Sequence, residues 1–304
     1  MLTQLDRIEK IRANIQIAFQ GSPQVIDYAL IGLLSGGHLL IEDVPGVGKT
    51  TLAKAIAQSV GGTFRRIQFT PDLLPADVLG VNVYSPKTGE FHFKKGPVFT
   101  NILLADELNR TSPRTQASLL ECMNETQVSI DGETYPLERP FLVIATQNPY
   151  EFDGTYPLPE SQLDRFLLKF NIGYPSRSAQ KKMLANSQIY RSPSLEPVAQ
   201  PEDILQLQKQ VEEVEVCEEI LEYILDIVEE SRKQPHVIGV SPRGMLYLRQ
   251  AAQALALLRG RSYCIPDDIK ELAVPVLSHR LIFTKGLESE NWIRELLEKI
   301  PPPR

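Results

Sequence analysis

Cysteine, histidine and tryptophan are scarce in this chain of 304 residues, which has three, four and one of them. Cys122, Cys217 and Cys264 lie far apart without CxxC spacing, so neither a disulfide framework nor a cysteine-based zinc site is predicted. The histidines are scattered too and offer no alternative set of zinc ligands. A few scattered cysteines are typical of a reducing compartment, so a cytoplasmic location is expected.

Long hydrophobic runs are also absent. The longest candidate, residues 28–41, is interrupted by glycine, serine and histidine, and it falls short of the about 18 apolar residues of a membrane span. Residues 1–7 carry charges where a secretory signal would have its apolar stretch. We therefore expect neither a signal peptide nor insertion into a membrane.

A surplus of basic residues is missing as well. The chain has 32 lysine and arginine residues against 38 aspartate and glutamate residues, which gives a net charge of −6. A protein that binds duplex DNA or an anionic membrane over a broad surface usually carries the opposite balance. Nucleic acid is therefore an unlikely partner, although a local basic patch is compatible with this balance.

The pattern of apolar residues changes once along the chain, and the length of the chain suits two domains of about 150 residues each. Up to residue 174, short apolar or β-branched runs alternate with helical stretches, as in parallel strands that are buried on both faces. The predicted strands are residues 38–42, 64–69, 101–105, 141–146 and 166–170. This pattern predicts an α/β core with a doubly wound, parallel, five-stranded sheet over residues 1–174.

After residue 174 the strand signal disappears, and an all-α domain is predicted over residues 175–304. Within it, Ser241 followed by Pro242 is typical of the first positions of a helix, because serine caps the free N–H groups and proline needs no hydrogen bond there.

The strongest chemical signal is residues 43–50, DVPGVGKT, directly after the first predicted strand and before a helix. This is the layout of a P-loop, in which small residues let backbone N–H groups surround a phosphate at a helix N-terminus. Lys49 is expected to reach the β- and γ-phosphate oxygens, and Thr50 to ligate Mg²⁺. The strict pattern has glycine in place of Asp43, but the residues that line the phosphate are intact. The predicted nucleotide-binding residues are Pro45, Gly46, Val47, Gly48, Lys49, Thr50 and Thr51.

Polar side chains also follow two other strands. Asp106 and Glu107 end the third predicted strand, where the first would hold Mg²⁺ and the second would orient the attacking water and accept its proton. Asn148 follows the fourth strand and can help to hold the water or the γ-phosphate, although a turn residue before Pro149 explains it equally well. The carboxyl ends of parallel strands meet at one edge of the sheet, so these signals converge on one site for ATP and Mg²⁺.

Taken together, the motifs resemble the MoxR family of AAA+ ATPases, in the helix-2-insert clade that also includes the ATPase subunits of magnesium chelatase. The resemblance spans nearly the whole chain. It is carried by residues 42–50 (EDVPGVGKT), 105–110 (ADELNR), 145–149 (ATQNP), 154–160 (GTYPLPE), 162–166 (QLDRF) and 241–243 (SPR).

The resemblance implies an AAA+ core followed by a helical lid, with Asp43 as a usual variant of the P-loop. Arg165 would be the arginine finger that reaches the nucleotide of a neighbouring subunit. Arg243 would be the sensor-2 arginine of the lid, stabilising the transferred phosphoryl group together with Lys49. Arg110 lies near the same edge, and the sequence leaves open whether it acts across a subunit interface or forms an ordinary salt bridge.

Two β-hairpins are predicted as insertions in the core. Residues 79–96 have alternating valines before a Lys-Thr-Gly turn, and residues 128–135 contain an Asp-Gly pair that suits a tight turn. By resemblance they are the helix-2 insert and the pre-sensor-1 hairpin. In relatives such hairpins can face a central pore and touch a client, but a solvated hairpin tip fits the sequence at least as well.

The expected function is Mg²⁺-dependent ATP hydrolysis in a homo-oligomeric ring, by resemblance a hexamer, coupled to chaperone-like remodelling or maturation of protein complexes. A separate partner with a von Willebrand factor A domain is implied by resemblance only. The alternatives are the motor subunit of a metal chelatase and a nucleotide-gated scaffold or nucleic-acid remodeller. Glu107 and Arg165 argue against a scaffold that does not hydrolyse ATP.

Overall fold

One half of the molecule is built around a parallel sheet with the strand order β2-β5-β8-β1-β9. The structure is a computed structural model that describes residues 4–149, 154–185, 194–233, 237–283 and 288–303. The five strands are β1 (Leu39–Glu42), β2 (Phe64–Gln68), β5 (Ile102–Asp106), β8 (Leu142–Gln147) and β9 (Leu168–Phe170). All neighbouring pairs in this sheet are parallel, so the predicted five-stranded sheet is confirmed.

Successive residues of the central strands belong to different hydrophobic clusters. Leu104 packs in the cluster that contains the helices α1 to α3, whereas Leu103 and Ala105 pack with residues of α5. Side chains alternate across a strand, so this division places helices on both faces of the sheet. The helices within residues 4–213 are α1 (Gln4–Ala18), α2 (Pro23–Leu34), α3 (Lys49–Ser59), α4 (Pro75–Leu79), α5 (Pro113–Glu125), α6 (Glu160–Leu163), α7 (Arg177–Ala185) and α8 (Pro201–Glu213), with the 3-10 turn η1 (Leu108–Arg110).

The strand β2 differs from its neighbours because it lies at the edge of the sheet. Only Ile67 of this strand is buried, while Arg65, Arg66 and Gln68 are exposed. The expectation of a strand buried on both faces was therefore wrong for β2. An edge strand can carry polar side chains on a solvent-facing side, and two of these reach the functional site.

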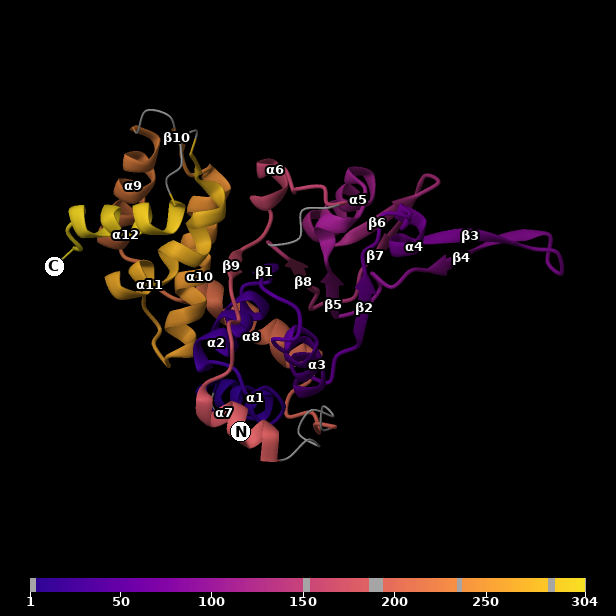
Figure 1. Ribbon diagram of the computed structural model, residues 1–304, viewed down its shortest axis with the longest axis horizontal. Helices are drawn as coiled ribbons and strands as arrows, with labels where there is room; N and C mark the ends of the chain where they lie inside the picture. Colours follow the sequence, from indigo (N-terminus) through magenta and orange to yellow (C-terminus); the bar gives the residue numbers. More distant parts are fainter. Residues whose placement is uncertain (1–3, 150–153, 186–193, 234–236, 284–287, 304) are drawn as a thin grey trace.

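The C-terminal half is helical and lies beside the sheet (Figure 1). Its elements are α9 (Glu218–Lys233), α10 (Pro242–Leu258), α11 (Pro266–Leu277), α12 (Ser289–Lys299), the 3-10 turn η3 (Ser278–Arg280) and the two-residue strands β10 (Val237–Ile238) and β11 (Ile282–Phe283). The strands β10 and β11 form a short antiparallel pair, which was not predicted from the sequence. Ser241 caps α10 as expected, its hydroxyl accepting the N–H of Gly244 at 3.0 Å.

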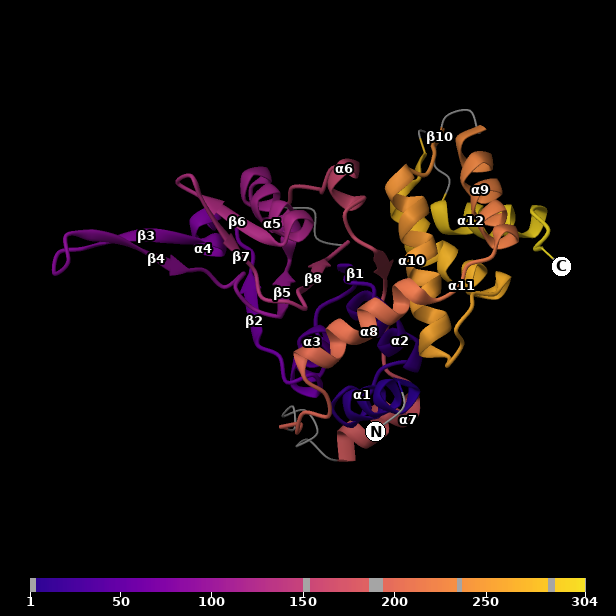
Figure 2. The same ribbon diagram turned by 180° about the vertical axis from the view of Figure 1, so that it is seen from behind.

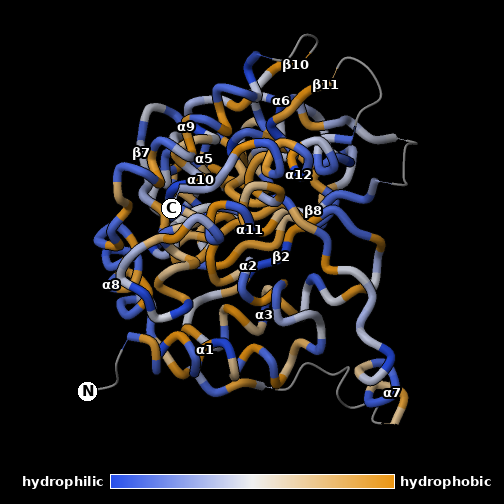
Figure 3. Tube along the Cα trace, turned by 90° about the vertical axis from the view of Figure 1, so that its left-hand side faces the viewer, coloured by the Kyte–Doolittle hydropathy of each residue, from blue (hydrophilic) through white to orange (hydrophobic). Residues whose placement is uncertain are grey.

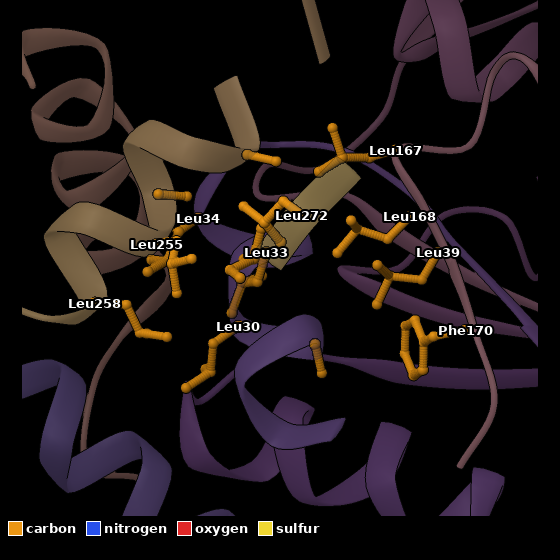
Figure 4. Packing of buried hydrophobic residues seen from close by; sticks show 14 of the residues in the cluster. Leu30, Leu33, Leu34, Leu39, Leu167, Leu168, Phe170, Leu255, Leu258 and Leu272 are labelled. Atoms are coloured by element: carbon orange, nitrogen blue, oxygen red, sulfur yellow. The ribbon is translucent and has the colours of Figure 1, made fainter. Parts of the chain in front are cut away.

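The two halves share one hydrophobic core. Leucines of α2 lie between β1 and β9 on one side and α10 and α11 on the other (Figure 4). The helix α8 packs against both α2 and α10, and in Figure 2 it runs in the foreground from α3 toward α10. The predicted boundary at residue 174 stays a prediction, since helices on both sides of it contribute to the same core.

Apolar residues gather toward the interior of the molecule, and polar residues lie mostly at its periphery (Figure 3). In the ranges that the structure describes, no helix combines the length and the apolar character that crossing a membrane requires.

Two hairpins project from the sheet half, at the side opposite the C-terminal helices (Figures 1 and 2). They are formed by β3 (Gly80–Ser85) with β4 (Glu90–Lys95), and by β6 (Gln127–Ile130) with β7 (Glu133–Pro136). The rings of Phe93 and Tyr135 stack at 4.1 Å, and Asn82 donates to Asp131 at 2.6 Å. These contacts make the two hairpins one unit.

The sheet contains a buried histidine that makes folding stability sensitive to acid. His38 directly precedes β1; its Nδ1 accepts the N–H of Val143 at 3.1 Å, and its Nε2 faces the carbonyl of Met123 at 3.0 Å. Nδ1 therefore has no proton, and Nε2–H donates. Burial lowers the pKa of His38 to about 4.

We predict that the free energy of unfolding falls as the pH drops from 6.5 toward 4. In this pH range His38 binds a proton in the unfolded chain but stays neutral in the folded protein. The contribution of this one group is about 3 kcal/mol over the whole window. Urea titrations at pH 7, 6 and 5 should show a shallower decline for His38→Gln than for the wild type. The variant keeps part of the slope, since burial also lowers the pKa of His279. Equal slopes in the two proteins would contradict the prediction.

Candidate nucleotide site

The predicted phosphate-binding residues line one cavity of about 330 Å³ at the carboxyl ends of β1, β5 and β8. Its walls include Asp106, Glu107 and Asn148, together with all the predicted P-loop residues except Val47. Two further lining residues, Arg66 and Gln68, come from β2 and were not predicted.

The P-loop has the backbone conformation that its glycines permit. Gly46 and Gly48 have φ values of 88° and 104°, in the region that L-residues with side chains avoid. The helix α3 begins directly after Gly48, so its free N–H groups and the positive end of its dipole face the loop. Lys49 Nζ donates to the carbonyl of Asp43 at 2.7 Å, and burial lowers the pKa of this lysine while the neighbouring carboxylates oppose the shift.

Asp43, which replaces the first glycine of the strict pattern, anchors the P-loop at its start. One carboxylate oxygen accepts the N–H of Val44 at 2.8 Å, and the other accepts the N–H of Gly173 at 2.7 Å. The second bond joins the loop to the segment that follows β9. An aspartate here thus fixes two parts of the site that lie 130 residues apart.

The two carboxylates after β5 are held by a buried threonine on the next strand. Thr146 Oγ1 donates to Asp106 Oδ1 at 2.6 Å and accepts the N–H of Glu107 at 2.9 Å. Glu107 has a left-handed backbone, with φ of 57°, and such strain persists where the surroundings fix it. Thr146 therefore sets the turn that presents both carboxylates to the cavity. Asn148, two residues further along, was predicted from its place after the strand, whereas Thr146 was not.

A chain of polar contacts from β2 continues this arrangement. Arg66 pairs with Asp106 at 2.6 Å, and it also donates to Gln68 at 2.7 Å. Gln68 Nε2 donates to Glu107 Oε2 at 2.6 Å, and Arg110 reaches the same oxygen at 3.2 Å. Arg110 thus forms a salt bridge within its own chain. The polar residues of β2 mark it as an exposed strand, but their place at the site follows from the pairing of β2 with β5.

A second cavity, of about 410 Å³, adjoins the P-loop and shares several of its residues. It is lined mostly by apolar side chains from the end of α1, the start of the P-loop and α7. The large apolar and aromatic side chains that line it include Phe19, Val47, Tyr174, Met183 and Leu184. A largely apolar recess beside a phosphate-binding loop is suited to a planar base.

Arg165 and Arg243 lie elsewhere. Neither is among the residues that line the two cavities as the described ranges show them. Arg165 donates to the carbonyl of Leu120 in α5 at 2.7 Å, and Arg243 lies 3.7 Å from the carboxylate of Asp164. The role of Arg243 at the transferred phosphoryl group stays a prediction, and in this structure the start of α10 is held against Asp164.

Asp164 gathers three groups of the C-terminal half. Besides Arg243, its carboxylate accepts the hydroxyl of Ser241 at 2.8 Å and Nε of Arg280 at 3.0 Å. Arg280 is almost completely buried, which lowers its pKa to about 10, and the carboxylate of Asp164 opposes this shift. The residue next to Arg165 thereby ties α10 and η3 to the sheet half.

Comparison with known proteins agrees with the geometry. The sequence profile of the ATPase family associated with various cellular activities (AAA) matches residues 38–168, and that of the AAA lid domain matches residues 232–300. The chain is 42% identical to the protein named Chaperone MoxR1 of Mycobacterium tuberculosis, over 100% of its own length and 84% of that protein. It belongs to the MoxR family of AAA+ ATPases.

Two other relatives cover nearly the full chain. The uncharacterized protein YeaC of Bacillus subtilis is 49% identical over 95% of this chain and 93% of its own. The crystal structure of a candidate ATPase from Cytophaga hutchinsonii is 36% identical, with a TM-score of 0.91 over 99% of this chain and 96% of that one. The resemblance stated from the motifs is thus confirmed, as is the AAA+ core with a helical lid.

The donor atoms of the MoxR site fit Mg²⁺. The hydroxyl of Thr50 and the carboxylate of Asp106 line the same cavity, and both are hard oxygen ligands. Within the described residues no cluster of three or more His, Cys, Asp or Glu side chains could enclose a metal by itself. Such a sparse donor set suits Mg²⁺, which usually takes most of its ligands from phosphates and water.

Replacing Thr146 by valine should disturb this site without changing its shape. Thr146→Val removes the donor to Asp106 and the acceptor for Glu107 N–H, and leaving buried groups unpaired costs about 1–3 kcal/mol of folding stability. We expect ATP turnover to fall by about 10- to 100-fold, as displaced catalytic groups do. Thr146→Ser keeps the hydroxyl and serves as the control. Full turnover in Thr146→Val would show that the threonine does not position the two carboxylates.

Proposed function

We propose that this MoxR protein hydrolyses Mg²⁺-bound ATP in a homo-oligomeric ring and uses the energy for chaperone-like remodelling of protein complexes. The supporting observation is that the P-loop, Asp106, Glu107 and Asn148 share one cavity beside an apolar recess. The phosphates would lie on the P-loop and the adenine in the recess.

Each residue has a distinct task in the proposed reaction. The N–H groups at the start of α3 and Lys49 hold the β- and γ-phosphates, and Thr50 and Asp106 hold the metal. Bound magnesium would neutralise phosphate charge. Glu107 orients the attacking water and takes its proton, and Asn148 holds the water or the γ-phosphate from the other side.

The two arginines outside the cavity would serve the site of a neighbouring subunit. Arg165 follows Asp164 in the sequence, and Arg243 lies near its carboxylate in space. The side chain of Arg243 is partly exposed. An arginine supplied from outside the site stabilises the charge that develops on the transferred phosphoryl group. We extend this role to Arg243, so that both arginines would stabilise the phosphoryl group in the site of the neighbouring subunit.

The shared core favours movement between subunits over movement within one. Separating α10 and α11 from α2 would expose leucines that are now buried. We infer that residues 175–304 act as a lid that moves with its own sheet half. Nucleotide-driven changes would then alter the contact of this rigid unit with the next subunit's nucleotide.

Remodelling of a protein client is favoured by the relative named a chaperone. A separate partner with a von Willebrand factor A domain rests on the family resemblance alone, as does a hexameric ring. The motor subunit of a metal chelatase remains the second candidate. A cytoplasmic location agrees with the proposed use of ATP as substrate. It also agrees with the three cysteines, all of which are free.

The first test is steady-state ATP turnover against protein concentration with Mg²⁺ present. Activity per subunit should rise steeply with concentration, because the site gains its arginines only on assembly. Turnover that stays constant down to concentrations at which sizing shows a monomer would contradict the ring. Loss of turnover with EDTA, restored by added Mg²⁺, checks the metal.

A mixing experiment tests the proposed transfer of Arg165 between subunits. Arg165→Ala leaves the site of its own chain intact, whereas Glu107→Gln retains the arginine but lacks the base. Each variant alone should be nearly inactive. An equal random mixture should recover about a quarter of wild-type activity, since a quarter of the interfaces combine a complete site with an arginine. No recovery in mixed oligomers would place Arg165 in another role.

A further inference from the structure

Arg66 is a cation placed where the site is expected to accept a metal. Its Nε and Nη2 both lie against Oδ2 of Asp106, at 3.2 Å and 2.6 Å. The other carboxylate oxygen, Oδ1, accepts the hydroxyl of Thr146 at 2.6 Å. Both oxygens of Asp106 are thus occupied by donors of this chain, and the one that Arg66 holds belongs to a residue that lines the phosphate cavity.

The placement of Arg66 follows from the edge position of β2. Arg66 and Gln68 are two residues apart, so their side chains leave the strand on the same face. Gln68 is paired in register with Asp106 of β5, and Arg66 with Leu104. The arginine side chain runs along the strand for two residues to reach the carboxylate. Its side chain is 46% exposed, so it can swing away without disrupting the core.

The guanidinium of Arg66 and a magnesium ion would compete for Oδ2 of Asp106. Mg²⁺ requires its oxygen ligands at about 2.0–2.1 Å, and a nitrogen in hydrogen-bond contact with the same oxygen would bring two cations into close repulsion. A water molecule bound to the metal that donates to Oδ2 would compete with the two nitrogens of Arg66 that already contact this oxygen. In both cases the Arg66 pair opposes the binding of the metal at Asp106, and its release favours that binding.

We propose that Arg66 is a positioning residue that holds Asp106 until Mg²⁺-bound nucleotide displaces it. This inference rests on the proposed ATPase function. While it is paired, Arg66 neutralises a carboxylate that would otherwise repel the incoming phosphates. Displacement also breaks the bond from Arg66 Nη2 to Gln68, which itself holds Glu107. The arrival of the metal is thereby coupled to a looser hold on the catalytic base.

The coupling predicts two opposite effects of one substitution. In Arg66→Ala the metal meets no competing cation, so the free Mg²⁺ concentration that gives half of the metal-dependent gain in nucleotide affinity should fall at least threefold. In EDTA the same variant should bind nucleotide more weakly than the wild type, because Asp106 is no longer neutralised. Simple damage to the site would weaken both.

The measurement is equilibrium binding of a fluorescent, non-hydrolysable ATP analogue, titrated with MgCl₂ at buffered free metal. Arg65→Ala is the matched control: it removes the same charge one residue away, from the opposite face of β2. It should leave the metal dependence unchanged. Arg66→Lys, which keeps the charge but loses the planar fork, should give an intermediate value. Thermal unfolding of each variant checks that the fold is retained.

The outcomes separate this inference from the proposed function. A half-saturating Mg²⁺ concentration that is unchanged or higher in Arg66→Ala would overturn the competition and leave Arg66 as a bystander or an orienting group. Equal shifts in Arg66→Ala and Arg65→Ala would reduce it to a general effect of charge and overturn it as well. If the wild type binds no analogue at any Mg²⁺ concentration, the proposed ATPase function itself fails.

Discussion

The parallel register of β5, β8 and β1 is the constraint on which the functional site depends. Ala105 lies opposite Ala145, and Glu42 lies opposite Gln147, so the strands end at one level and their polar successors meet. A slip by one residue would turn every side chain to the other face of the sheet. It would exchange the two hydrophobic clusters and remove Asp106 from Thr146. The packing of leucine, isoleucine and alanine thus holds the carboxylates of Asp106 and Glu107 in place.

What the sequence could predict was local along the chain. The P-loop, Asp106, Glu107 and Asn148 each follow their own strand, so a linear pattern located them and the sheet brought them together. Arg66, Gln68 and Thr146 depend on which strand lies beside which, and the strand order places β2 next to β5 and β5 next to β8. A pattern of residues along one segment contains no information of that kind.

The apolar recess and the placement of Arg243 escaped prediction for a related reason. The recess joins the end of α1 to α7, which are about as far apart in sequence as the whole predicted core. Arg243 is predicted to act on the transferred phosphoryl group, and its position in the folded chain is set by the packing of α10 on α2 and by Asp164. A lone carboxylate between Ser241 and the buried Arg280 is an arrangement that only the folded chain reveals.

The net charge of −6 would oppose the binding of ATP if the whole surface acted together. It does not, since charges farther apart than about 8 Å are largely screened in physiological salt. At the P-loop the positive sources are Lys49, Arg66 and the N-terminus of α3, and the carboxylates of Asp106 and Glu107 line the same cavity. An extended polyanion such as duplex DNA would contact much more of the acidic surface. The charge balance therefore argues against a nucleic-acid partner, and it leaves a compact anion held by Lys49 and the N-terminus of α3 compatible with this fold.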